Sequence, residues 1–193
     1  IWIATPAGLD RLDPKTRRIE HFRHDATDAS SIADDRVRGL LVDRDGTLWV
    51  GTRDGLQRWR GEGRGFERVA SALAGQYVIR LHEDGRGRIW IGTEEHGAAV
   101  LDPRDGALRR IAPRPIDPNG LSHYWVYGFA EGVAGEMWIA TFGGGIDSVD
   151  GDSLAVIDRL KHDPLLADTI GADRIGAVFR DSSGVMWVGT WGE

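Results

Sequence analysis

Histidines and carboxylates are the side chains here with the greatest capacity for chemistry, but their spacing assembles no catalytic site. His21 and His24 stand three residues apart, and a metal would need two further ligands on the same face. His82 precedes Glu83 and Asp84 and could serve as a general base, yet no nucleophile is implied beside it. We therefore expect His21 and His24 to be a solvated pair, and we assign no catalytic residue.

The segment Asp43-Arg-Asp-Gly-Thr47 resembles the start of a calcium-binding loop. Such a loop needs Glu at its twelfth position, where this chain has Asp54, and no other Asp-x-Asp-Gly pattern occurs. The absence of Cys excludes disulfides, thiol catalysis and Cys-type zinc sites. We therefore expect no metal and no cofactor.

Charge and hydropathy exclude two further classes of function. The 193 residues carry 30 acidic and 24 basic side chains, interspersed along the chain, for a net charge of −6. Nucleic-acid binding needs a concentrated basic surface, which is missing. No uncharged apolar run approaches the roughly 18 to 20 residues that span a bilayer, so we expect no membrane span. The chain opens on Ile1 without an initiating Met, and we expect it to be an excerpt of a longer protein.

Tryptophan organises the rest of the chain. Five nearly identical segments have the form apolar-Trp-apolar-Gly/Ala-Thr, at spacings of 47, 41, 48 and 49 residues. A period of this size marks a solenoid, a propeller or an array. The segments are short and rich in β-branched residues, which favours strands over helices. We expect the indoles to pack between adjacent sheets as structural residues. The five tryptophans are Trp2, Trp49, Trp90, Trp138 and Trp187.

Each Trp segment lies among other short apolar runs that Gly-containing turns separate. One run precedes it, as in Val37 to Val42, and two follow, as in Gly55 to Trp59 and Phe66 to Val69. Four short antiparallel strands per repeat are the sequence signature of a propeller blade. We therefore predict an all-β fold, a β-propeller of four-stranded antiparallel blades with about four blades present. One propeller segment, 1–193, would hold repeats at approximately 1–35, 36–76, 77–123, 124–173 and, in part, 174–193.

One segment competes with this pattern. Ser31-Ile-Ala-Asp34 resembles a capping box and predicts a single helical turn before the strand that starts at Val37.

The repeats resemble the two-component regulator propeller repeat. The resemblance lies in Val37-x-x-Leu-x-x-Asp-x-x-Gly-x-Leu-Trp-Val-Gly-Thr-x-x-Gly-Leu56, and in the segment His24 to Ile32 with its echo from His162 to Ile170. The third repeat departs from it, with Gly132 where the turn Asp is expected. The resemblance implies part of a seven-bladed propeller in the periplasmic sensor region of a bacterial membrane receptor. In that family, a histidine kinase or a diguanylate cyclase lies beyond a transmembrane helix, and several members are linked to carbohydrates.

In a propeller, the loops that lead into the first strands and the turns after the second strands form one mouth of the central channel. Tyr and Trp there could stack on sugars or other flat ligands, and Arg could donate to carboxylate or phosphate. The alternative is that the aromatics fill the channel and the arginines are solvated. The candidate ligand-binding residues are Arg36, Arg53, Tyr77, His96, Tyr124, Trp125, Phe142 and Arg174.

We therefore expect a ligand-sensing extracytoplasmic domain of a signal-transduction receptor. Its ligand would be a small molecule or an oligosaccharide, and its parent receptor would form a homodimer. The alternatives are a propeller enzyme, of the lyase or quinone-dependent dehydrogenase type, and a structural propeller for protein interaction or dimerisation. No nucleophile–base pair, phosphate loop or metal set in the sequence supports an enzyme.

Overall fold

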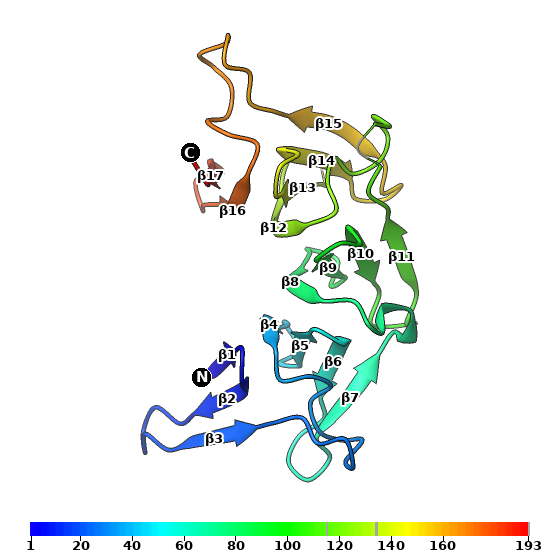
Figure 1. Ribbon diagram of the computed structural model, residues 1–193, viewed down its shortest axis with the longest axis vertical. Coiled ribbons are helices and arrows are strands. Elements are labelled where there is room, and N and C mark those ends of the chain that lie inside the picture. The colour runs from blue at the N-terminus through cyan, green and yellow to red at the C-terminus, as the bar shows by residue number, and fades with distance from the viewer. Residues whose placement is uncertain (115, 134, 193) are drawn as a thin grey trace. The chain divides into compact units, whose positions relative to one another are not determined.

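The computed structural model describes residues 1–114, 116–133 and 135–192, and these form seventeen short strands in antiparallel sheets (Figure 1). The predicted all-β fold, with four-stranded antiparallel sheets, is therefore confirmed. The chain forms two compact parts, Ile1–Glu83 and the part from Asp84 onward, which we call the N-terminal and C-terminal parts. No helix among the described residues is long and apolar enough to cross a membrane.

The N-terminal part contains a three-stranded sheet, a four-stranded sheet and one further strand. The two sheets have the orders β1-β2-β3 and β4-β5-β6-β7, and their facing sides bury a core around Leu9, Val37 and Phe66. Strand β8 lies against β4 and β5. The elements are β1 (Trp2–Thr5), β2 (Gly8–Leu12), β3 (Ile19–Phe22), β4 (Val37–Val42), β5 (Leu48–Thr52), β6 (Gly55–Trp59), β7 (Phe66–Val69), the 3-10 turn η1 (Ser71–Leu73) and β8 (Val78–Glu83).

The C-terminal part repeats this arrangement. Strands β9, β10 and β11 pair in order, β12 to β15 form a complete four-stranded sheet, and β16 pairs with β17. Strand β12 faces β9 on one side and β16 on the other. The elements are β9 (Ile89–Thr93), β10 (Ala98–Leu101), β11 (Leu108–Ile111), β12 (Val126–Glu131), β13 (Glu136–Thr141), β14 (Ile146–Asp150), β15 (Val156–Leu160), β16 (Ile175–Arg180) and β17 (Met186–Thr190).

In three repeats an Asp lies six residues before the Trp. Its carboxylate accepts hydrogen bonds both from the backbone of the turn and from the indole. Asp43 accepts the backbone N–H of Thr47 at 2.8 Å, which closes the turn between β4 and β5. The same carboxylate accepts the indole Nε1–H of Trp49 at 2.7 Å. The segment that resembled a calcium loop therefore uses Asp43 as a turn and indole acceptor. The bond recurs from Trp90 to Asp84 at 2.8 Å and from Trp187 to Asp181 at 2.7 Å.

In the repeat without a turn Asp, a different residue accepts the hydrogen bond of the indole. Gly132 occupies the position of the Asp, and the indole Nε1–H of Trp138 donates instead to Glu136, at 3.0 Å. The other oxygen of Glu136 accepts the hydroxyl of Ser148 at 2.7 Å, which ties β13 to β14. An acceptor for the indole is therefore retained although its position in the sequence has moved by four residues.

The Trp side chains lie at the seams between sheets, with one exception. Trp90 is fully buried and contacts Phe129 of the next sheet, with ring centroids 6.0 Å apart. Burying a ring of this size stabilises a fold by about 5 kcal/mol before entropy costs. Trp49 is also buried, and Trp2 and Trp138 are half-buried against the neighbouring sheets. Trp187 departs from the expected burial and is 60% exposed, because no other sheet in the described chain covers its face of β17.

Close approach of the sheets explains the small residue two positions after Trp. A Cβ on Gly51 would lie 2.7 Å from the carbonyl oxygen of Val78 in β8, and 2.6 Å from its side chain. Glycine at this position therefore lets the sheet containing Trp49 pack directly against the next strand.

The helical turn predicted at Ser31–Asp34 is absent, and that prediction is wrong. The hydroxyl of Ser31 accepts the backbone N–H of Asp25 at 3.0 Å and donates to the Asp25 carbonyl, so it closes the connecting loop rather than capping a helix. The 3-10 turn η1 occurs instead in the next connection.

We predict that replacing the turn carboxylate destabilises the fold far more than replacing its neighbour. Asp43→Ala removes the acceptor for three N–H groups, those of Asp45, Thr47 and the Trp49 indole, and should lower the free energy of unfolding by about 2 to 3 kcal/mol. Asp45→Ala removes an exposed carboxylate from the same turn and should change it by less than about 0.5 kcal/mol. Urea unfolding followed by circular dichroism measures both. Equal losses in the two variants would contradict the role assigned to Asp43.

A second prediction concerns acid. Hydrogen bonds from Ser183, and then from the Trp187 indole, lower the pKa of Asp181 from 3.8 to about 2. A group whose pKa is lower in the folded state stabilises the fold above its unfolded pKa and loses that effect as the pH falls. This contribution should be present above pH 3.8 and be lost as the pH falls through about 2. Urea unfolding across this range should show a shallower pH dependence for Asp181→Asn, and an unchanged slope would exclude the effect.

Candidate ligand-binding cleft

The C-terminal part contains a cleft of about 1110 Å³ where its sheets β12–β15 and β16–β17 meet. It is lined by aromatic, histidine and charged side chains. Four of the predicted ligand-binding residues lie in it: Tyr124, Trp125, Phe142 and Arg174.

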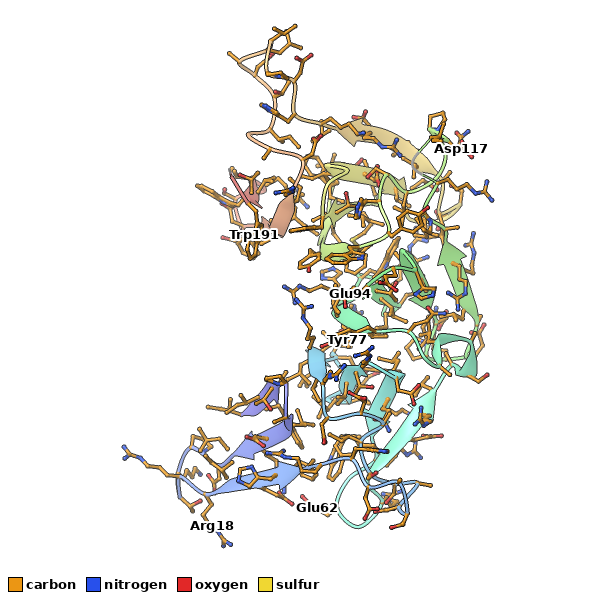
Figure 2. The ribbon with its side chains drawn as sticks, in the orientation of Figure 1. Arg18, Glu62, Tyr77, Glu94, Asp117 and Trp191 are labelled. Atoms are coloured by element: carbon orange, nitrogen blue, oxygen red, sulfur yellow. The ribbon has the colours of Figure 1, made fainter. Side chains whose placement is uncertain are left out.

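Aromatic rings form one wall of the cleft. Trp125 and Phe142 stack with ring centroids 5.7 Å apart and planes 26° apart. Trp191 meets Phe142 edge-on at 6.2 Å and 77°, and projects from the end of β17 (Figure 2). The guanidinium of Arg174 lies 6.0 Å from the Phe142 ring centroid. Trp191 remains 61% exposed and Tyr124 47% exposed, so both present ring surface to a ligand.

Backbone hydrogen bonds set these residues at equivalent places in successive repeats. We call the residue directly before a first strand the leading residue, and the residue directly after a Trp strand the turn residue. The turn residue Phe142 donates its N–H to the leading residue Trp125 at 3.1 Å, and Trp191 donates to Arg174 at 2.8 Å. Adjacent repeats therefore deliver one such pair each to the same cleft.

Two histidines line the cleft, and the hydrogen bond at each Nδ1 determines whether Nε2 donates or accepts. Nδ1 of His123 accepts the backbone N–H of Trp125 at 3.1 Å, which leaves Nε2–H as a donor. Burial lowers the pKa of His123, so it is neutral at pH 7. Nδ1–H of His162 donates to the carbonyl of Ile170 at 2.7 Å, which leaves Nε2 of the neutral ring as an acceptor. The cleft therefore offers both a donor and an acceptor beside its aromatic wall.

Glu95, Asp173 and Arg174 complete the polar lining. Asp173 is held in place, because its carboxylate accepts the backbone N–H of His162 at 2.7 Å. Its carbonyl accepts the N–H groups of Gly143 and Gly145, both at 3.0 Å. The connecting segment before β16 is thus fastened to the turn that carries Phe142.

A buried ion pair anchors the connecting segment that precedes β12. Asp147 of β14 is completely buried and accepts Nε–H of Arg159 at 2.6 Å. Its second oxygen accepts both the backbone N–H and the hydroxyl of Ser122, at 2.7 and 2.8 Å. Arg159 also donates to the carbonyl of Gly120 at 2.6 Å. Because Ser122 directly precedes His123, this pair positions the segment that lines the cleft.

In the N-terminal part, an uncharged side chain holds the corresponding connecting segment, which precedes β4, by hydrogen bonds. The side chain of Gln57 in β6 is buried, accepts the N–H of Ala33 at 2.6 Å and donates to the carbonyl of Ser31 at 3.2 Å. Gln57 and Asp147 each stand two residues after a Gly, which is the first residue of β6 in one case (Gly55) and directly precedes β14 in the other (Gly145). The anchor position is therefore shared, and only the Asp147 version depends on an ion pair.

The other predicted site residues lie outside the cleft. Arg36, Arg53 and Tyr77 belong to the N-terminal part, where Arg53 donates its N–H to the carbonyl of Arg36 at 3.2 Å. His96 is exposed in the turn after β9, with its Nδ1 3.3 Å from the carbonyl of Glu94, while the neighbouring Glu95 reaches the cleft lining.

The sequence prediction missed Trp191, His162 and Asp173 as lining residues. Trp191 could have been found, because it follows the Thr of its Trp strand as Phe142 follows Thr141. His162 belongs to the connecting segment that the resemblance singled out, but its role in the loop gave no reason to place it at a cleft. Among the described residues, no group of three or more His, Asp and Glu side chains is arranged to hold a metal.

We predict that Asp147→Asn loosens the connecting segment without unfolding the sheet. Removing one charge of a buried pair costs about 3 to 5 kcal/mol when the partner is left uncompensated. Amide hydrogen exchange at Ser122 and His123 should accelerate by at least about tenfold. Asp158→Asn, on the exposed side of the neighbouring strand, is the matched control and should leave these rates unchanged. Unaltered exchange in Asp147→Asn would show that the ion pair does not position the segment.

Three stretches of the chain, residues 31–54, 72–95 and 169–192, match the sequence model of a family described as two component regulator propeller. Each match runs from a connecting segment, through the first strand and the Trp strand, to the residues just after the turn residue. No curated protein matches the chain.

Solved structures share the fold at low sequence identity. The extracellular domain of BT4673 from B. thetaiotaomicron, described as a one component system, superposes with a TM-score of 0.82 at 21% identity, covering 98% of this chain and 24% of that one. The extracellular domain of BT3049 from the same organism, described as a hybrid two component system, gives 0.73 at 20% identity, covering 99% and 24%. A catalytically inactive virginiamycin B lyase from Staphylococcus aureus with quinupristin gives 0.69 at 14% identity, covering 96% and 57%.

The chain spans about a quarter of the length of the two extracellular domains that it matches. The three matches to the family coincide with the strands and turns of the structure. These three stretches are therefore similar to two component regulator propeller repeats.

Proposed function

We propose that the chain is a ligand-sensing, extracytoplasmic part of a bacterial signal-transduction receptor, and that its ligand is a carbohydrate bound in the cleft of the C-terminal part. The place in a receptor is supported by the family of the repeats and by the extracellular domains that share the fold. A periplasmic location follows from this proposal, and so does a kinase or cyclase output elsewhere in the receptor.

The observation that carries the proposal is the combination of exposed ring faces with fixed hydrogen-bonding groups in one cleft. Trp191 and Tyr124 expose large parts of their rings, and an indole or phenol face packs well against the C–H face of a sugar. His123 supplies a donor and His162 an acceptor, which suits hydroxyl groups that both donate and accept. Purely apolar ligands would leave these polar groups without partners.

Signalling would require that the ligand binds two receptor states with different affinity. The connecting segment 162–173 is suited to report occupancy, because Asp173 links His162 in the cleft to the turn at Gly143 and Gly145. A homodimer of the parent receptor is the natural recipient of such a change, and belongs to the same proposal.

We predict that Trp191→Ala weakens binding of the recognised saccharide by about two- to tenfold, because loss of one stacking ring removes about 0.5 to 1.5 kcal/mol. Isothermal titration of the intact chain against a panel of neutral and acidic oligosaccharides measures the affinity. Trp187→Ala is a closely matched control, since Trp187 is 60% exposed and lies in β17, which Trp191 directly follows, but is outside the cleft lining.

Two results would contradict the proposal. Absence of binding to every saccharide in the panel would remove the carbohydrate ligand, and equal losses in Trp191→Ala and Trp187→Ala would remove the cleft as its site. The lyase that shares the fold defines the rival function. Turnover of quinupristin or of a bound saccharide by the purified chain would favour an enzyme.

A further inference from the structure

The turn after β9, residues 94–97, holds one residue in a backbone conformation that its side chain disfavours. Glu95 has a φ of 77°. Left-handed backbone of this kind is routine for Gly but costs other residues free energy, because their Cβ crowds the backbone. Such residues cluster at ligand-binding sites. Among the described residues, three other non-Gly residues have a positive φ, and none of them lines the cleft. They are Arg17, Ala70 and Leu154.

The next repeat has glycine at the position of Glu95. In both repeats the Thr that ends the Trp strand closes the turn, because its N–H donates to the carbonyl of the Gly four residues later, at 3.0 Å for Thr93 and for Thr141. Glu95 and Gly143 each stand two residues after that Thr, and Gly143 has a φ of 119°. The turn therefore accommodates Gly at this position, and its geometry does not require Glu.

A hydrogen bond fixes this turn to the segment that lines the cleft. The N–H of Gly97 donates to the carbonyl of Tyr124 at 2.8 Å, as the N–H of Gly145 donates to that of Asp173 at 3.0 Å. Glu95 and Tyr124 line the same cleft. Glu95 is exposed, and among the described residues its carboxylate has no hydrogen bond or ion pair. Both of its oxygens are therefore available to a ligand.

The charged groups of the cleft favour an uncharged ligand. Apart from the two histidines, the charged lining residues are Glu95, Asp173 and Arg174. The Asp173 carboxylate accepts the backbone N–H of His162 at 2.7 Å, and the Arg174 guanidinium lies 6.0 Å from the centroid of an aromatic ring of the wall. Two carboxylates beside one guanidinium leave an excess of negative charge. This excess repels an anionic group of a ligand, whereas hydroxyl groups can donate hydrogen bonds to it.

We propose that Glu95 determines the specificity of the cleft, and that its carboxylate accepts hydrogen bonds from two neighbouring hydroxyl groups of an uncharged saccharide. The inference rests on the carbohydrate ligand proposed above, and it narrows that ligand to saccharides without a carboxylate or sulfate group. Hydrogen bonds from hydroxyl groups to an ionised carboxylate are short and strong. A saccharide with its own anionic group would bring two like charges together, which disfavours it. The strained backbone of Glu95 is then part of how the turn presents the carboxylate to the ligand.

Isothermal titration of the intact chain tests the specificity. The probes are neutral oligosaccharides and the same oligosaccharides with one hexose oxidised to its uronate. The wild type should bind the recognised neutral oligosaccharide at least about fivefold more tightly than its uronate counterpart. Glu95→Gln should weaken binding of the neutral form by about five- to tenfold, because a charge-assisted hydrogen bond contributes more than a neutral one. The same variant should bring the affinities for the two forms closer together.

The backbone strain gives a second readout, which needs no ligand. Glu95→Gly should raise the melting temperature by roughly 2 to 4 °C, because Gly adopts this φ without strain, and should weaken saccharide binding at least as much as Glu95→Gln does. Arg17→Gly is the matched control, since Arg17 has a φ of 59° and lies between β2 and β3, outside the cleft lining. It should also raise the melting temperature but leave binding unchanged. Thermal unfolding followed by circular dichroism measures both variants.

Failure of this inference is distinguishable from failure of the carbohydrate proposal. Absence of binding to every oligosaccharide would remove the carbohydrate ligand, and the role of Glu95 with it. If oligosaccharides bind and Trp191→Ala weakens them, but Glu95→Gln keeps the affinities and their order, the cleft stands and Glu95 does not determine its specificity. Tighter binding of the uronates by the wild type, or a lower melting temperature in Glu95→Gly, would also overturn the assignment.

Discussion

An indole N–H that needs a buried acceptor is the constraint on which the rest of this structure depends. Four of the five repeats pack a tryptophan at the seam between sheets, and an indole buried there without a partner would cost free energy. The turn carboxylate supplies the partner, and the same group closes the turn that aligns the first strand with the Trp strand. Local turn and long-range packing are therefore fixed by one side chain, which explains the constant six-residue spacing from Asp to Trp. Where the Asp is replaced by Gly132, the acceptor reappears at Glu136.

The fold could be predicted because its signals are local and repeated. The first strand Val37–Val42 and the third strand Gly55–Trp59 begin and end where the apolar runs and Gly turns placed them. The failures arose where a side chain has two possible partners. Ser31 was expected to cap a helical turn, but its hydroxyl bonds to the backbone of Asp25, six residues earlier, and so closes the connecting loop instead. The exposure of Trp187 could not be predicted from its motif, because burial depends on a neighbouring sheet rather than on the strand itself.

The candidate sites were harder to predict, for a related reason. Propeller geometry indicated which positions face a mouth, and Tyr124, Trp125, Phe142 and Arg174 do line one cleft. The sequence does not indicate which of these positions share one cleft. It therefore did not separate Tyr124, Trp125, Phe142 and Arg174, which line the cleft, from the predicted site residues of the N-terminal part. Nor did it reveal the anchors, since Asp147 and Gln57 differ in charge and share only a place in the third strand. The repeats thus hold their connecting segments by side chains at one shared position of the third strand. The residue types at the leading and turn positions differ from repeat to repeat.

Hydrogen exchange of the indole N–H protons tests most directly whether carboxylates hold the repeat tryptophans at the seams. In an intact, ¹⁵N-labelled chain the five repeat indoles can be followed together with Trp191, which is 61% exposed and so serves as an internal reference. The indoles of Trp49 and Trp90, which are buried and bonded to Asp43 and Asp84, should exchange at least about a hundredfold more slowly than that of Trp191. Exchange of Trp49 and Trp90 at the rate of Trp191 would contradict the role of the carboxylates in holding the blades together.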